Sequence, residues 1–273
     1  QIMNEERKYA HTEEHPVIAW QRMGEGPVLM LVHGFPENGG LWSAVAPGLG
    51  EHFTLIIPDL PGAGESRFGG PVLTMEAMAA QLAEVLRREA VEEAVIAGHS
   101  MGGYTALAFT DIYPEMVKGL ALIHSGAYAD NDEKKETRRK SIALIQKGGK
   151  EIFVRQMIPN LFSEKFKKEN PAILEKQISR ALQLEDQAMI AFYEAMLARP
   201  DRTHVLRRGH LPVQWVIGQD DKTTPPTPAL QQASLSDISF IELYEDCAHM
   251  SMLEQPERLA EDLVKFGLYC NNR

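Results

Sequence analysis

Short, uninterrupted apolar runs alternate with amphipathic helical patterns along this chain of 273 residues. The apolar runs include Val28–Val32, 53–57, 94–97 and 120–123. Strands that lack polar alternation are typical of a parallel sheet covered by helices on both faces. The sequence therefore predicts an α/β fold with a mostly parallel central sheet flanked by helices.

The alternation is interrupted once. Two opening strands are expected at 6–11 and 17–23, which makes 120–123 the sixth strand, and strand patterns resume only at 212–217 and 240–244. The segment between them reads as polar-faced helices broken by glycine and proline. We therefore expect one core domain, residues 1–125 and 211–273, with a helical cap (126–210) inserted after the sixth strand. The insertion follows the carboxyl end of a strand, the edge where open α/β sheets bind ligands.

The sequence Gly98-His99-Ser100-Met101-Gly102 follows the apolar run 94–97 and precedes a predicted helix at 103–113. In this strand-to-helix setting, G-x-S-x-G is typical of a turn that exposes a serine hydroxyl above the sheet, with the helix N-terminus directed towards it. The two glycines allow the close backbone contacts of such a turn. We predict that Ser100 is a nucleophile rather than part of an ordinary glycine-rich turn.

A serine hydroxyl needs a general base, which a carboxylate orients in turn. Asp220 and Asp221 follow the predicted strand at 212–217, and His249 follows the strand at 240–244. Both loops belong to the same edge of the sheet as Ser100. We predict that His249 is the base and Asp221 the acid, with Asp220 as the alternative acid.

Stabilisation of a tetrahedral oxyanion needs two converging N–H groups. Met101 supplies one as the residue after the nucleophile, and Phe35, in the turn after Val28–Val32, is placed to supply the other. The residues proposed to line a substrate pocket are His33, His99, Phe162 and Phe192.

These motifs resemble those of the α/β-hydrolase fold superfamily, in its serine hydrolase branch with a helical cap. The resemblance covers nearly the whole chain outside the cap and includes the order Ser, Asp, His, the D-x-x-G-x-G-x-S segment 59–66 and the sequence Glu254-Gln255-Pro256. It implies a cofactor-independent hydrolase. The segment 33–37 is similar to that of epoxide hydrolases and haloalkane dehalogenases, but those relatives use an aspartate nucleophile, and position 100 is serine.

The expected function is hydrolysis of a small, largely apolar carboxylic ester or lactone through an acyl-enzyme. A C–C bond hydrolase or an acyltransferase could use the same three residues, and a non-catalytic ligand receptor is a further alternative. No H-E-x-x-H or similar ligand spacing occurs in the sequence, so no metal is expected.

Charge and cysteine content limit the partners and the compartment. The chain has 38 acidic and 28 basic side chains, a formal net charge of −10, which disfavours nucleic acid as a partner. No apolar run is long enough to span a membrane. Two cysteines, Cys247 and Cys270, fit a reducing compartment, taken to be the cytoplasm. The charged segment 1–10 does not resemble a signal peptide, although a chain that begins at Gln1 is compatible with loss of an earlier segment. The sequence does not determine the oligomeric state.

Overall fold

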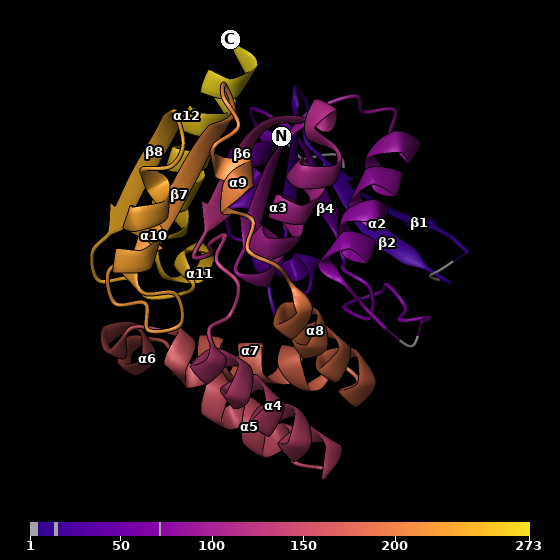
Figure 1. The fold of residues 1–273 in the computed structure, drawn as a ribbon, viewed down its shortest axis with the longest axis vertical. Helices are drawn as coiled ribbons and strands as arrows, with labels where there is room; N and C mark the ends of the chain where they lie inside the picture. Colours follow the sequence, from indigo (N-terminus) through magenta and orange to yellow (C-terminus); the bar gives the residue numbers. More distant parts are fainter. Residues whose placement is uncertain (1–4, 14–15, 71) are drawn as a thin grey trace.

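The computed structural model describes residues 5–13, 16–70 and 72–273. Its centre is one eight-stranded sheet with the strand order β1-β2-β4-β3-β5-β6-β7-β8 (Figure 1). The strands are β1 (Glu6–Ala10), β2 (Ile18–Met23), β3 (Val28–Val32), β4 (Thr54–Pro58), β5 (Ala94–His99), β6 (Val117–Ile123), β7 (Pro212–Gly218) and β8 (Ile238–Tyr244). Residues 1–4 and 14–15, at the amino terminus and between the two opening strands, lie outside the described part.

The sheet is parallel from β4 to β8, and only β1 and β2 run antiparallel to their neighbours. This confirms the predicted α/β fold. The register pairs Val32 of β3 with Gly98 of β5, and His99 of β5 with Ile123 of β6. The carboxyl ends of these three strands therefore lie side by side.

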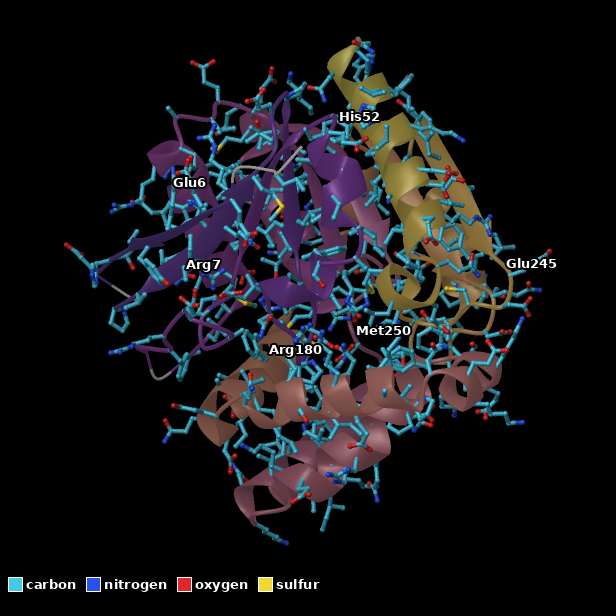
Figure 2. The ribbon with its side chains drawn as sticks, turned by 180° about the vertical axis from the view of Figure 1, so that it is seen from behind. Glu6, Arg7, His52, Arg180, Glu245 and Met250 are labelled. Atoms are coloured by element: carbon cyan, nitrogen blue, oxygen red, sulfur yellow. The ribbon has the colours of Figure 1, made fainter. Side chains whose placement is uncertain are left out.

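Helices cover both faces of the sheet, as the apolar strands require. The helices α1 (Ala46–Gly50) and α12 (Pro256–Asn271) pack together on one face, and α2 (Met75–Arg88) packs against α3 (Met101–Ile112) on the other (Figures 1 and 2). The α2 helix begins where Thr74 accepts a hydrogen bond from the Ala77 N–H at 3.0 Å. Short helices η1 (Gly39–Trp42), η2 (Pro114–Met116), α10 (Pro226–Ala233) and α11 (Ser251–Glu254) complete the connections.

The chain between β6 and β7 forms a separate helical layer at the carboxyl edge of the sheet (Figure 1). It contains α4 (Asp132–Gln146), α5 (Lys150–Met157), η3 (Ile158–Leu161), α6 (Glu164–Glu169), α7 (Pro171–Leu182) and α8 (Asp186–Ala198). The next helix, α9 (Thr203–Leu206), packs instead against α3 and α10, so the chain has already returned to the core before residue 210. We use the term cap for the layer formed by α4 to α8.

Candidate active site

Ser100 lies between the end of β5 and the start of α3. Its φ angle is +51°, a conformation that non-glycine residues rarely adopt. The Ser100 N–H donates to the Ile123 carbonyl at 3.0 Å, which ties the strained turn to β6. Gly102 faces the Val32 and His33 carbonyls so closely that a Cβ atom there would collide with both. The turn therefore has the backbone that G-x-S-x-G predicts.

His249 and Asp221 are in direct contact. The His249 Nδ1 atom lies 2.8 Å from Asp221 Oδ2, and the Asp221 side chain is 0% exposed. The other carboxylate oxygen, Oδ1, accepts from the N–H groups of Thr223 and Thr224, each at 2.9 Å. Asp220 is exposed, and its N–H donates to the Cys247 carbonyl. Of the two adjacent aspartates, the structure places Asp221 against the imidazole.

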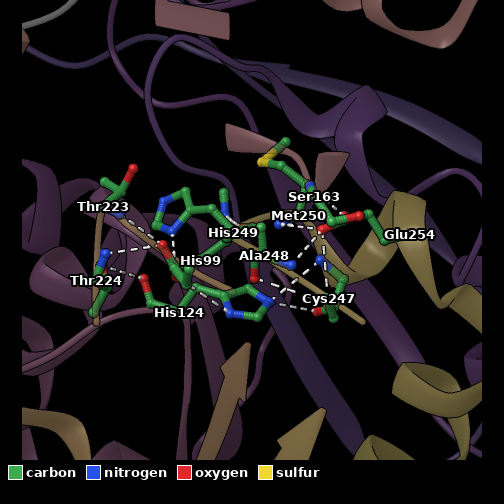
Figure 3. Close-up of polar contacts among 12 residues, drawn as sticks. His99, His124, Ser163, Thr223, Thr224, Cys247, Ala248, His249, Met250 and Glu254 are labelled. Carbon is green, nitrogen blue, oxygen red and sulfur yellow. Dashed lines mark hydrogen bonds and ion pairs between the residues drawn. The ribbon is translucent and has the colours of Figure 1, made fainter. Parts of the chain in front are cut away.

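Two further histidines surround this pair (Figure 3). The His99 Nε2 atom lies 2.9 Å from the His249 carbonyl, so Nε2 must carry the hydrogen that is donated. The His124 Nε2 atom accepts from the Ser251 N–H at 3.2 Å, which leaves its hydrogen on Nδ1, 3.7 Å from Asp221 Oδ2. Burial lowers the pKa of both His99 and His124 well below the usual histidine value. Both rings are therefore neutral at pH 7.

Glu254 organises the loop that carries His249. One carboxylate oxygen accepts from the Ala248 N–H at 2.9 Å, and the other accepts from the Ser163 N–H of the cap at 2.9 Å (Figure 3). The His249 N–H donates to the Leu161 carbonyl, also in the cap, at 2.9 Å. The loop is thus held from the core and the cap together. Cys247 in the same loop is a buried free thiol, and burial raises its pKa far above the usual range.

The turn after β3 approaches Ser100 closely. A Cβ atom on Gly34 would lie 2.8 Å from His99 Nδ1 and 3.2 Å from Ser100 Cβ, so only glycine allows this approach. Within the described part of the chain, the turns and helix caps contain no hydrogen bond donated by the Phe35 or Met101 N–H.

Glu37 closes this turn and connects it to the cap. Its N–H donates to the Gly34 carbonyl at 3.1 Å, and its carboxylate lies 3.3 Å from Arg180 of α7, at the junction of cap and core (Figure 2). The amide of Gln177, oriented so that its nitrogen donates, lies 2.9 and 3.1 Å from the two Glu37 oxygens. Burial raises the pKa of Glu37 to about 7, because desolvation outweighs the attraction of Arg180.

A cavity of about 590 Å³ brings Ser100, His249 and Phe35 together. The cap and the loop after β7 supply most of its wall. The apolar and aromatic lining consists of Phe35, Tyr104, Met157, Leu161, Tyr193, Met196 and Pro225. The polar lining includes Asn131, Glu133, Lys134, Thr137, Arg138, Ser141, Asn160, Lys222 and Thr223. The wall therefore combines apolar residues with several charged and polar side chains.

The structure does not bring the four expected pocket residues to this wall. His33 is buried beneath the turn, where its Nε2 atom accepts from the Leu60 N–H, and His99 is buried behind His249. Phe162 stacks on Phe166 and borders a different cleft, while its neighbour Leu161 lines the cavity. Phe192 contacts the ring of Phe35 from behind, and the next residue, Tyr193, faces the cavity.

The positions of His124 and Glu254 beside the pair of His249 and Asp221 were not expected from the sequence. Glu254 was noted only as part of a family sequence, and its position five residues after His249 was the available signal. His124 follows β6 at the same sheet edge as Ser100, a position that could have marked it. Among the described residues, no cluster of three or more His, Cys, Asp or Glu side chains could hold a metal ion. The same residues include no helix with the length and apolar character needed to cross a membrane.

A family model described as "alpha/beta hydrolase fold" matches residues 27–256. The pimeloyl-[acyl-carrier protein] methyl ester esterase of Yersinia enterocolitica is 28% identical over 262 residues, which cover 93% of this chain and 98% of that protein. The corresponding esterase of Pseudoalteromonas atlantica is 25% identical over 263 residues, 92% of this chain and 98% of that one.

Solved structures are similar over the same length. A thermophilic esterase from Thermogutta terrifontis, solved with malate bound, is 32% identical with a TM-score of 0.91, and the match covers 97% of this chain and 99% of that one. The enol-lactonase of Burkholderia xenovorans has a TM-score of 0.87 at 19% identity, covering 95% and 99% of the two chains, which shows a shared fold.

Proposed function

Because the chain belongs to the alpha/beta hydrolase fold family and is a hydrolase, we propose that it cleaves carboxylic esters or lactones with Ser100, His249 and Asp221. The observation that carries the proposal is the shared cavity of Ser100 and His249, with His249 Nδ1 2.8 Å from the buried Asp221 carboxylate. A hydrogen bond to Nδ1 leaves the other imidazole nitrogen, Nε2, free to take a proton.

In the proposed mechanism, the Ser100 hydroxyl attacks the ester carbonyl while His249 Nε2 takes its proton. The oxyanion that forms is bound by the N–H groups of Phe35 and Met101. His249 then returns the proton to the leaving alcohol, and an acyl-enzyme remains on Ser100. A water molecule, deprotonated by His249, attacks this acyl group, and collapse of the second tetrahedral intermediate releases the acid and restores the serine.

Asp221 has a precise part in this scheme. Its contact with Nδ1 fixes the tautomer of His249, and its negative charge stabilises the imidazolium that forms during each attack. The two N–H groups of Thr223 and Thr224 on its other oxygen keep the carboxylate oriented. His124 lies within 3.7 Å of the same carboxylate as a neutral ring, so it adds no competing charge.

We further propose that the insertion 126–210 acts as a lid. Leu161, Tyr193 and Met196, all from this insertion, line the cavity that contains Ser100, which supports the role. The relatives that are esterases support a small-molecule ester as substrate. The two buried free cysteines support a reducing compartment such as the cytoplasm.

A fluorophosphonate probe tests the proposal, because it reacts with activated serines. We expect stoichiometric labelling, located at Ser100 by peptide mass spectrometry, and hydrolysis of p-nitrophenyl butyrate and of a simple lactone. Labelling and turnover should both be absent in Ser100→Ala, with an unchanged melting temperature. Heat-unfolded protein serves as the control for non-specific labelling.

Labelling elsewhere, or turnover in Ser100→Ala within about tenfold of the wild type, would contradict the covalent mechanism. Absence of both labelling and turnover in the folded wild-type protein would favour the ligand receptor. Probe labelling without hydrolysis of any ester or lactone would favour the C–C hydrolase or the acyltransferase.

A further inference from the structure

One wall of the cavity contains a charge cluster that the proposed mechanism does not use. Asp130, whose side chain is 0% exposed, lies between two guanidinium groups. Arg138 Nε is 2.6 Å from one carboxylate oxygen, and its Nη2 is 3.4 Å from the other. Arg199 Nη1 contacts that second oxygen at 3.0 Å. Arginine stays protonated in proteins, so two cations share one anion. The cluster carries a formal charge of +1 in a largely dehydrated place.

The cluster borders the cavity that contains Ser100. Arg199 is committed to the protein, since its other hydrogen bonds go to the Met196 and Tyr128 carbonyls, and its guanidinium carbon is 3.7 Å from the centre of the Tyr104 ring. Tyr104 lies one helical turn from Ser100, and its N–H donates to the Ser100 carbonyl at 3.2 Å. Both Tyr104 and Arg138 line the cavity that contains Ser100 and His249.

Arg138 is the cavity-facing member of the cluster. Its side chain is 17% exposed, and its guanidinium carbon is 5.1 Å from the centre of the Tyr193 ring, which holds the planar group at the wall. Lys134 and Lys222 also line the cavity. Among the described residues that line it, Glu133 is the one acidic residue. The wall is therefore positive overall.

A buried or half-buried net charge is stabilised most effectively by an opposite charge placed against it. Resting on the proposed ester hydrolysis, we propose that the substrate is an anionic ester, and that Arg138 binds its carboxylate. The apolar residues near Ser100, such as Leu161 and Met196, would contact a short methylene chain between the ester and the carboxylate. A carboxylate matches the formal charge of +1 on the cluster of Asp130, Arg138 and Arg199, and arginine binds carboxylates through directed N–H groups.

Two methyl esters of equal chain length test this proposal. Monomethyl glutarate ends in a carboxylate, and methyl pentanoate has a methyl group in its place. We expect the wild-type kcat/KM to be at least about tenfold higher for monomethyl glutarate, as charge-assisted hydrogen bonds imply. Arg138→Gln should lower this ratio by about tenfold or more, and Arg138→Lys, which keeps the charge, should lower it less. The matched control is Arg139→Gln on the exposed side of α4, which should keep the wild-type ratio.

A wild-type preference for methyl pentanoate would overturn the proposal, as would equal ratios in the wild type and in folded Arg138→Gln. If Arg138→Gln lowers kcat/KM equally for both esters, Arg138 has only a structural role and the proposal is wrong. Thermal melts identify any variant that fails to fold. If Arg138→Gln does not fold, the ratio of kcat/KM values measured for Arg138→Lys tests the proposal instead.

Calorimetry separates this inference from the proposed function. If the wild type hydrolyses neither ester, sodium glutarate titrated into Ser100→Ala still tests the anion site. Glutarate binding that is present in Ser100→Ala and lost in Ser100→Ala/Arg138→Gln supports the anion site. Absence of glutarate binding in Ser100→Ala refutes the anion site.

Discussion

Replacement of Glu37 by glutamine is expected to stabilise the protein, and to do so more strongly at pH 8 than at pH 5. The Glu37 side chain is 1% exposed, and its pKa is raised from 4.5 to about 7 by burial that Arg180 only partly offsets. A raised pKa means that the folded state holds a proton that the unfolded chain has already lost. Stability therefore falls as the pH rises from about 4.5 to 7.

The size of the effect follows from the pKa displacement. Each pH unit by which a pKa is displaced corresponds to about 1.4 kcal/mol, so ionised Glu37 costs about 3 kcal/mol once the pH exceeds 7. Glutamine resembles the protonated acid in shape and keeps an oxygen for Arg180. Glu37→Gln should therefore melt within about 1 °C of the wild type at pH 5 and about 6–12 °C higher at pH 8, at roughly 2–4 °C per kcal/mol for a chain of this size.

Differential scanning calorimetry at pH 5, 6.5 and 8 measures this difference. The control is Glu136→Gln. Glu136 is 59% exposed, and its carboxylate is 3.9 Å from Arg139 Nη1. Because such an exposed pair contributes little, the melting temperature of this variant should match the wild type at each pH. A Glu37→Gln protein that melts below the wild type at pH 8 would refute the reasoning. It would show that the ion pair with Arg180 outweighs the cost of burial.

Three further predictions concern the candidate site. Asp221→Asn should lower kcat for p-nitrophenyl butyrate on the order of 10⁴-fold, because His249 would adopt the wrong tautomer. The kcat of Asp220→Asn should stay within about threefold of the wild type. The reverse order would overturn the choice of Asp221 as the acid. Glu254→Ala leaves the Ala248 and Ser163 N–H groups without an acceptor, which should lower the free energy of unfolding by about 1–3 kcal/mol for each group. The melting temperature should fall, and kcat should fall about 10- to 100-fold. An unchanged kcat would show that Glu254 does not position His249. Dialysis against EDTA should leave activity unchanged, and a loss that one divalent ion restores would show a metal requirement.

The parts of the fold that depend on local sequence were predictable. Val28–Val32 has the predicted bounds, and α2 begins after Thr74 because an extended N-cap with a hydroxyl acceptor is a local signal. The strained turn at Ser100 was predictable for the same reason, because G-x-S-x-G between a strand and a helix is also a local signal. The next strand begins at Thr54 rather than Phe53, because the Phe53 N–H donates to the Leu49 carbonyl and closes the preceding helix. An apolar run alone does not distinguish the last residue of a turn from the first of a strand.

The parts of the site that depend on tertiary packing could not be read from the sequence. Helical spacing marks an apolar face on η3 and α8 without deciding which of two neighbours points into the cavity, and Leu161 and Tyr193 do so where Phe162 and Phe192 were expected. The contact between Arg199 and Asp130 joins residues separated by all five α-helices of the cap, α4 to α8. No sequence pattern predicts this contact.

The contacts between the cap and the His249 loop limit how such a protein can be recombined. The Leu161 carbonyl accepts from the His249 N–H, and Glu254 accepts from the Ser163 N–H. A chimaera that takes its cap from a relative inherits a new backbone at 161–163 while keeping the old loop at 248–254. Crossovers placed only at the cap boundaries would therefore combine the His249 loop of one parent with the residue 161 carbonyl of another. In a library of such chimaeras, activity should depend on whether 161–163 and 248–254 come from the same parent. These two short segments therefore form one unit of inheritance, although 84 residues of chain (164–247) lie between them.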